Sequence, residues 1–233
     1  MNVEQMYEAL SYGELSNLAL SGEGSGLILD EKKPQVLLAL NEGLLRLHTK
    51  FVLREKEVII EMVRHITNYH LLARFAHYTT PVVERWTYIR DMPNDRFVED
   101  VLKVTGAYNT YGQALPLNDS EQDLSIFTPQ LNMVQIPRPV HGSAVSLLYQ
   151  ARHAELLLDT PEQDILVPDS LMGALRAYVA YKIYSQLGTQ EATVKAVEHM
   201  NTYEAICNEV ETHGMTLGNP STTNVRFDKR GWI

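Results

Sequence analysis

Residues 34–62, PQVLLALNEGLLRLHTKFVLREKEVIIEM, change from the repeat of a helix to that of a strand. Up to residue 51 the apolar side chains recur every three or four positions, as on one face of an amphipathic helix: Val36, Leu37, Leu40, Leu44, Leu47 and Phe51. Pro34 suits the first turn of this helix, and Asp30 lies upstream where a capping residue would stand. From Lys56 the run EVIIEM is rich in β-branched residues, which favour strands. The segment therefore predicts a helix followed by a β region.

The strand-like character continues over residues 56–160. The runs WTYIRDM, VLKVTGAY, NMVQIPRP and AVSLLYQARH carry β-branched and aromatic residues, and proline and glycine separate them as turns or edges. We predict an antiparallel β module of about five or six short strands. One run, ITNYHLLARF at residues 66–75, favours a short helix instead.

Helical spacing returns after Pro168, where Asp169 or Ser170 is a candidate cap. Gly188 and Thr189 end one helix and begin a second, which runs to about His213. These helices form a predicted hairpin that packs against the helix at residues 34–51. Two short helical pieces, MYEAL and GELSNLAL, are predicted near the N-terminus.

Together these patterns predict an α+β fold, in which a bundle of three to four helices is interrupted by an antiparallel β insertion module. We divide the chain into residues 1–55 and 161–213 for the bundle, residues 56–160 for the β module, and residues 214–233 for an extended C-terminal arm.

Composition argues against a nucleic-acid-binding protein and against a membrane protein. The chain has 233 residues, of which 45% are hydrophobic, and a formal net charge of −9. That charge argues against tight binding to nucleic acid through phosphate contacts. The single cysteine, Cys207, lies on a helical apolar stripe and fits a role in core packing. The N-terminus lacks a signal-peptide pattern, and no apolar run approaches the roughly 20 residues that span a bilayer. We expect a soluble protein made in the cytoplasm.

The sequence shows no catalytic signature, and we expect no catalytic, cofactor or metal site. His65, His70 and His77 are spaced by five and seven residues, which do not align on one helix face. Glu99 and Asp100 are adjacent in a predicted strand, where neighbours point to opposite faces. Acid–base pairing between these two carboxylates is therefore not expected.

The C-terminal segment GMTLGNPSTTNVRFDKRGWI, residues 214–233, differs from an ordinary polar tail. Its end alternates apolar anchors with basic residues, and we predict that it docks into a partner rather than onto its own domain. The proposed docking residues are Val225, Arg226, Phe227, Lys229, Arg230, Trp232 and Ile233.

The order of segments resembles a known family. The series comprises YGELSNLAL, NEGLLRLHTKFVLREKEVII, YIRDMPNDRFVEDVLKV, LPLNDSEQDLSIFTPQLNMVQIPRP, SLLYQARHAEL, ILVPDSLMGALRAYVAYKIY and TTNVRFDKRGWI. Taken together, it is similar to the head-to-tail adaptor (connector) proteins of tailed bacteriophages, especially short-tailed ones. The resemblance covers nearly the whole chain, although no single phrase in it is a catalytic motif.

The resemblance implies a structural protein of the virion, located at the portal vertex between head and tail. Such adaptors form a homo-oligomeric ring, usually of about twelve subunits, beneath the portal protein. The ring extends the channel for genomic DNA, which passes without tight binding, and offers a platform for a tail nozzle or tail-tube protein. Here the helices would form the ring wall, the β module would face the tail, and residues 214–233 would dock into the portal.

Two alternatives come from other classes. The first is a non-virion phage regulatory protein that binds a host partner through its C-terminal tail and never associates with a portal. The second is an enzyme whose site is assembled from scattered residues such as His141, His153 and Asp159. Histidines with perturbed pKa values in a deep pocket would favour the enzyme.

Overall fold

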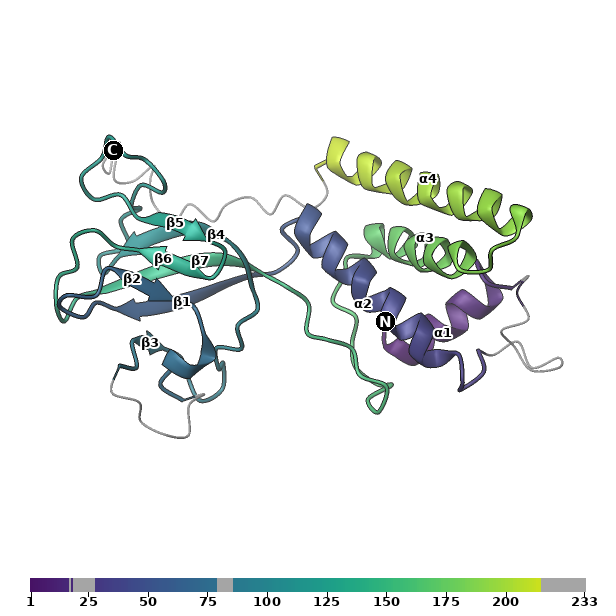
Figure 1. The fold of residues 1–233 in the computed structure, drawn as a ribbon, viewed down its shortest axis with the longest axis horizontal. Helices are drawn as coiled ribbons and strands as arrows, with labels where there is room; N and C mark the ends of the chain where they lie inside the picture. The colour runs from purple at the N-terminus through teal and green to yellow at the C-terminus, as the bar shows by residue number, and fades with distance from the viewer. Residues whose placement is uncertain (17, 19–27, 79–85, 215–233) are drawn as a thin grey trace, which may run out of the picture. The chain divides into compact units, whose positions relative to one another are not determined.

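The computed structural model of the chain describes residues 1–16, 18, 28–78 and 86–214. Within these ranges it contains four α-helices and two antiparallel sheets, so the protein is mixed α+β, as predicted (Figure 1). The chain forms two compact units, Met1–Leu166 and Val167–Ile233. The first unit holds two helices and all the described strands, and the second holds a helical hairpin. No described helix is both long enough and apolar enough to cross a membrane.

The first helix, α1 (Val3–Tyr12), begins with a capping box, in which Asn2 and Gln5 each accept a hydrogen bond from the backbone N–H of the other. It ends at Gly13, where an added Cβ would lie only 2.8 Å from the carbonyl oxygen of Ala9. The prediction of a second short helix over GELSNLAL is wrong for its described part. Residues 13–16 form turns, because the chain leaves the helix at Gly13.

Helix α2 (Lys33–Lys50) confirms the predicted helix to within one residue at each end. Pro34 lies in its first turn, as predicted. The prediction for Asp30 is wrong, since the helix has no side-chain cap and Asp30 pairs with Lys33 at 2.7 Å instead. From α2 the chain runs through a short segment into the first strand (Figure 1).

The larger sheet has four strands in the order β3-β1-β7-β4, and its central pair is β1 and β7, which align in register from Glu55↔Gln150 to Glu61↔Ala144. The second sheet has the order β2-β6-β5. A single apolar core includes residues from both sheets, such as Ile60, Leu147 and Val134. The strands are β1 (Glu55–Glu61), β2 (Asn68–His70), β3 (Ile89–Arg90), β4 (Val101–Asn109), β5 (Phe127–Gln130), β6 (Met133–Gln135) and β7 (Ala144–Ala151).

The helix predicted at residues 66–75 is wrong. The segment forms strand β2 and then a short 3₁₀-helix, Ala73–Phe75. Two tyrosines hold it extended: the hydroxyl of Tyr69 accepts a hydrogen bond from the backbone N–H of Val63, and the hydroxyl of Tyr88 bonds both backbone groups of His70. The bonds of Tyr88 use the N–H and C=O of His70, which a helix would have satisfied internally.

The second unit contains α3 (Asp169–Ser185) and α4 (Gln190–Thr212), which pack as a hairpin. Thr189 caps α4 through the N–H of Ala192 at 3.2 Å, as predicted, and Gly188 takes a positive φ of 67° at the turn. The capping prediction for Asp169 or Ser170 is wrong, because the residue that precedes α3 is Pro168 and no side chain caps this helix. Cys207 is buried in α4, as predicted.

Helix α3 is buried more extensively than α4. Its larger apolar side chains, among them Leu171, Leu175 and Val179, are buried, and so are the alanines between them. Ten of its 17 residues are buried, compared with five of 23 in α4. Small alanine side chains allow close approach of neighbouring elements around most of the helix. The packing of α2 with this hairpin into one bundle stays a prediction.

Candidate functional site

The residues proposed for docking lie outside the described residues: Val225, Arg226, Phe227, Lys229, Arg230, Trp232 and Ile233. Their role stays a prediction from sequence. The candidate site that the structure does describe lies elsewhere, within the first unit.

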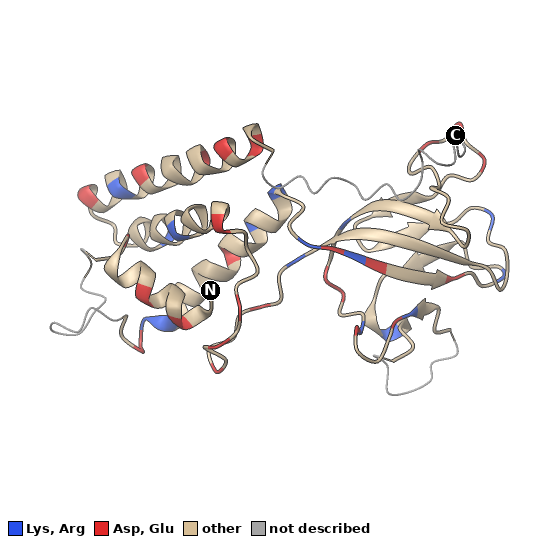
Figure 2. Cartoon of the chain, turned by 180° about the vertical axis from the view of Figure 1, so that it is seen from behind, with Lys and Arg blue, Asp and Glu red and all other residues tan. Residues whose placement is uncertain are grey.

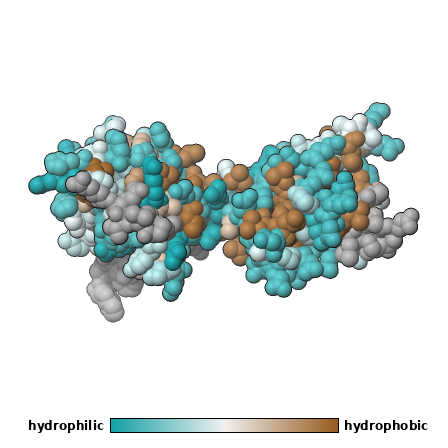
Figure 3. Space-filling view, turned by 60° about the horizontal axis from the view of Figure 1, so that its bottom comes forward, coloured by the Kyte–Doolittle hydropathy of each residue, from teal (hydrophilic) through white to brown (hydrophobic). Residues whose placement is uncertain are grey.

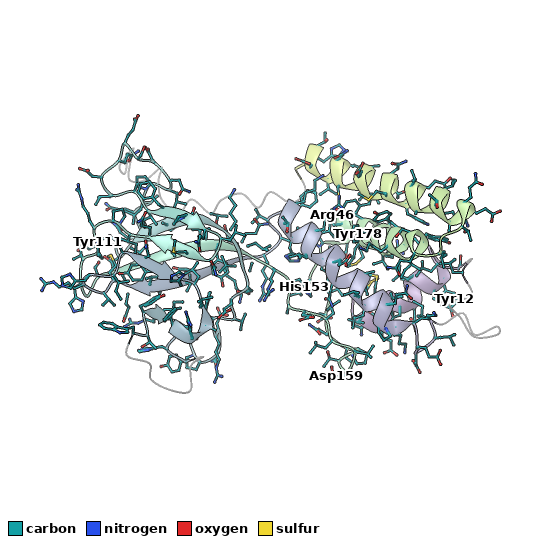
Figure 4. The ribbon with its side chains drawn as sticks, in the orientation of Figure 1. Tyr12, Arg46, Tyr111, His153, Asp159 and Tyr178 are labelled. Atoms are coloured by element: carbon teal, nitrogen blue, oxygen red, sulfur yellow. The ribbon has the colours of Figure 1, made fainter. Side chains whose placement is uncertain are left out.

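The structure does not bring together His141, His153 and Asp159, the residues named above for the enzyme alternative. His141 precedes β7 and His153 follows it, and eight extended residues separate the two ends of this strand by about 26 Å. Asp159 is exposed at the tip of the following loop, away from His153 (Figure 4). The three residues therefore do not converge. His153 instead meets a residue that the sequence analysis did not single out, His48.

A cavity of about 870 Å³ lies in the first unit, beside α2 and the ends of β1 and β7. One part of its wall is apolar and comes from α2 and the loop before β4, with Leu38, Leu45 and Val98. Another part is charged. Its lining includes Arg54, Arg96, Arg152, Lys56, Asp95, Asp100, Glu155 and His153.

Two polar side chains fasten α2 to the segment that lines this cavity. Asn41 donates to the carbonyl oxygen of Leu156 at 3.0 Å and accepts from its N–H at 2.9 Å. Gln150, buried on β7, donates to the carbonyl oxygens of His48 and Phe51 at the end of α2. The bonds of Gln150 satisfy carbonyl groups that the end of a helix leaves open, and those of Asn41 satisfy both backbone groups of Leu156. The wall of the cavity is thus fixed by hydrogen bonds as well as by apolar packing.

His48 and His153 form a buried pair behind the wall, with ring centroids 5.5 Å apart in an edge-to-face arrangement. Nδ1 of His48 donates to the carbonyl oxygen of Ala151 at 3.3 Å. Nδ1 of His153 donates to the carbonyl oxygen of Ala154, and its Nε2 accepts the N–H of Leu166 at 2.9 Å. Burial lowers the pKa of both rings. The pKa of His48 is lowered further because two neighbouring imidazoles resist being protonated together, and the positive charge of Arg54 lowers that of His153 further.

This pair should make the stability of the protein depend on pH. Because both folded-state pKa values lie below the usual value of about 6.5, the unfolded chain takes up protons that the folded chain excludes. The free energy of unfolding is therefore expected to fall as the pH drops below about 6.5, until the lower folded-state values are reached. Urea unfolding between pH 7.5 and 5 measures this slope.

The matched variants for that measurement are His48→Asn and His141→Asn. The first removes a buried imidazole and keeps a donor for Ala151, so its slope should be flatter than that of the wild type. The second removes an exposed imidazole and should keep the wild-type slope. Equal slopes for all three proteins would show that the buried pair does not set the pH dependence.

A second buried network holds the cavity floor. Lys56 Nζ lies 3.0 Å from Asp100 Oδ2, and the hydroxyl of Tyr149 donates to Asp100 Oδ1 at 2.9 Å. The side chains of Lys56 and Asp100 are only 14% and 5% exposed. Burial, and then the neighbouring Asp100 carboxylate, raise the pKa of Tyr149, so its hydroxyl stays protonated and remains a donor. Glu99, next to Asp100, accepts the backbone N–H of Ala73. The prediction that these two residues lie in a strand is wrong, because both precede β4 and Glu99 has a positive φ of 57°.

Three arginines of the lining remain without a carboxylate. Arg54 and Arg152 are brought together because the N–H of Ala151 donates to the carbonyl oxygen of Arg54 at 2.9 Å, and Arg96 comes from the loop after β3. Among the described residues, none of the three makes an ion pair, whereas Lys56 is paired with Asp100 and Asp95. The cavity therefore presents three arginines without an ion pair to a described residue beside an apolar wall, within a lining that also carries the carboxylates of Glu42, Asp95, Asp100 and Glu155.

Histidines with lowered pKa values beside a cavity are the feature that would favour an enzyme, so the bonds that these rings make are informative. Both ring nitrogens of His153 are bonded to the backbone, which leaves neither to exchange a proton with a substrate. His48 does not line the cavity. In the part of the chain that the structure describes, no three His, Cys, Asp or Glu side chains gather where they could hold a metal ion.

Comparison with known proteins adds no further identification. Neither the models of known protein families nor the sequences of curated proteins match this chain.

Proposed function

We propose that this chain is the head-to-tail adaptor of a short-tailed bacteriophage. In this proposal, copies of the chain form a ring beneath the portal, extend the channel for genomic DNA and carry the tail. The order of sequence segments supports the family. The observation that carries the proposal is the exposure of large apolar side chains on separate elements, because such residues normally mark contacts with other proteins when they cluster.

These exposed residues lie on α2, on α4 and at the ends of the strands. Leu38 and Leu45 on α2 are one heptad apart and therefore share a face. Val194 and Val197 lie on α4, and Tyr111, at the turn after β4, is 87% exposed. Apolar side chains appear as brown patches among hydrophilic ones in Figure 3. A protein that contacts copies of itself, a portal and a tail needs several such surfaces, whereas an enzyme needs one pocket.

Electron cryo-microscopy of virus particles that contain this chain tests the proposal. We expect a ring of this chain directly below the portal. A particle that lacks the chain at this vertex would overturn the proposal, and binding to a host protein alone would favour the regulatory alternative.

The surface for the tail is expected at one end of the larger sheet. Asn109 pairs with Val145, so the loops that carry Tyr111 and Val140 meet at this end of β4 and β7. Figure 4 shows Tyr111 pointing outward. Both side chains are more than half exposed, and replacing both by serine removes apolar contact area without opening the core.

The double variant Tyr111→Ser/Val140→Ser should therefore still join DNA-filled heads but capture tails at least about tenfold less well. Met92→Ser, another exposed apolar position, is the matched control and should behave as the wild type. Counting tailed particles by electron microscopy measures the difference. Normal tail attachment by the double variant would mean that this end of the sheet does not face the tail.

A further inference from the structure

We propose that the arginine-lined cavity of one copy receives the acidic outer face of helix α4 of a second copy. The inference rests on the proposed function, which requires contacts between identical chains, and it names the two surfaces that meet.

The receiving surface combines unpaired charge with exposed apolar side chains. Arg54, Arg96 and Arg152 line the cavity without an ion pair among the described residues. Leu38 and Leu45 of α2 line the same cavity and are 62% and 48% exposed. An arginine with no partner can form charge-assisted, two-point hydrogen bonds with an incoming carboxylate. The occupant should therefore carry carboxylates spaced among small apolar residues.

Helix α4 of the same chain presents that pattern. Glu191, Glu198 and Glu209 are seven and eleven residues apart, which corresponds to two and three turns and places them along one face. None of the three makes an ion pair within the described residues. Val194 and Val197, each 54% exposed, lie beside them. Figure 2 shows acidic residues distributed along α4. Lys195 is the one lysine or arginine in the sequence of this helix.

Charge and geometry together favour a second copy over other anions. A nucleic acid would satisfy the arginines but would leave the exposed leucines of α2 in contact with phosphate and water. The face on α4 supplies both the carboxylates and the valines. The cavity and the helix are different surfaces, so the contact is head-to-tail, and a bound pair of copies still has one cavity and one helix open. Contacts of this kind close only as a ring or continue as a filament.

Charge reversal with rescue tests the contact on the full-length chain. Sedimentation equilibrium over a series of protein concentrations measures self-association at low and at high salt. We expect association that weakens as salt is raised. Arg152→Glu and Glu198→Lys should each weaken the association constant about tenfold or more, because each places like charges together. The double variant Arg152→Glu/Glu198→Lys should recover most of the loss.

Two controls carry the same changes of charge outside the proposed contact. Lys103→Glu on β4 and Glu162→Lys in the loop before α3 are exposed and should associate as the wild type does. Three results would overturn the inference: a chain that stays monomeric at every concentration, reversals no stronger than the controls, or a double variant without rescue. Preferential binding of the wild type to a DNA oligonucleotide through Arg152 would do so as well. Attachment of the same variants to portal-containing heads is measured separately, so failure of this contact is distinguishable from failure of the adaptor function.

Discussion

Replacement of Asp100 by alanine is expected to lower the free energy of unfolding by about 3 kcal/mol. The substitution leaves Lys56, which is 14% exposed, without its buried partner, and it removes the acceptor of the Tyr149 hydroxyl. A buried charge that loses its partner costs more than the intact pair contributes, because the remaining charge is still largely removed from water. For a chain of this size the melting temperature should fall by roughly 6–12 °C.

The matched control is Asp123→Ala, which breaks the ion pair with Arg138 at 3.2 Å. Both side chains of that pair are largely exposed, so the loss should not exceed about 0.5 kcal/mol. Urea unfolding followed by circular dichroism compares the two variants. If Asp100→Ala costs no more than Asp123→Ala, the buried network does not stabilise the cavity floor.

Local periodicity predicts the elements whose structure depends on neighbours within a turn or two. The apolar spacing of residues 34–51 predicts α2 to within one residue at each end. Gly188 and Thr189 predict the turn into α4. The helix prediction for residues 66–75 fails because the hydrogen bonds that decide the structure of this segment are not local. Tyr88 bonds the backbone of His70 from 18 residues away, and no pattern within the segment contains that information.

The candidate site depends even more on contacts between residues that are far apart in the sequence. Gln150 reaches the end of α2 across 102 residues, and Arg54 meets Arg152 only because β1 and β7 pair in one register. A shift of one residue in that pairing would turn these side chains to other faces. One signal was available in the sequence. His48 follows Leu44 by four residues, so a polar side chain stands on the buried stripe of a helix and requires a partner.

The C-terminal arm, residues 214–233, is expected to anchor the chain to the portal. Trp232 is the expected centre of this contact, since truncation of a buried tryptophan at an interface costs about 2–4 kcal/mol. Arg226, Lys229 and Arg230 would set register and the rate of approach more than affinity. Ordering a segment of this length is costly in conformational entropy, so one arm should bind weakly. Arms that engage together in a ring raise the effective concentration of each other and offset that cost.

A chain truncated after Pro220 should therefore keep its fold and lose its place in the particle. The arm is expected to dock into a partner rather than onto its own domain, so far-UV circular dichroism and melting should stay near those of the full chain. The truncated chain should fail to sediment with DNA-filled, portal-containing heads, and packaged DNA should leak from those heads. Trp232→Ala should show a milder form of the same defect, whereas Trp86→Ala, at the half-exposed second tryptophan of the chain, should bind heads normally. Trp232→Ala weakens the binding of every arm in the ring, and these losses combine because the arms bind together. We therefore expect the number of heads that carry this variant to fall severalfold. Binding of the truncated chain at the wild-type stoichiometry would show that the portal anchor lies in the folded units.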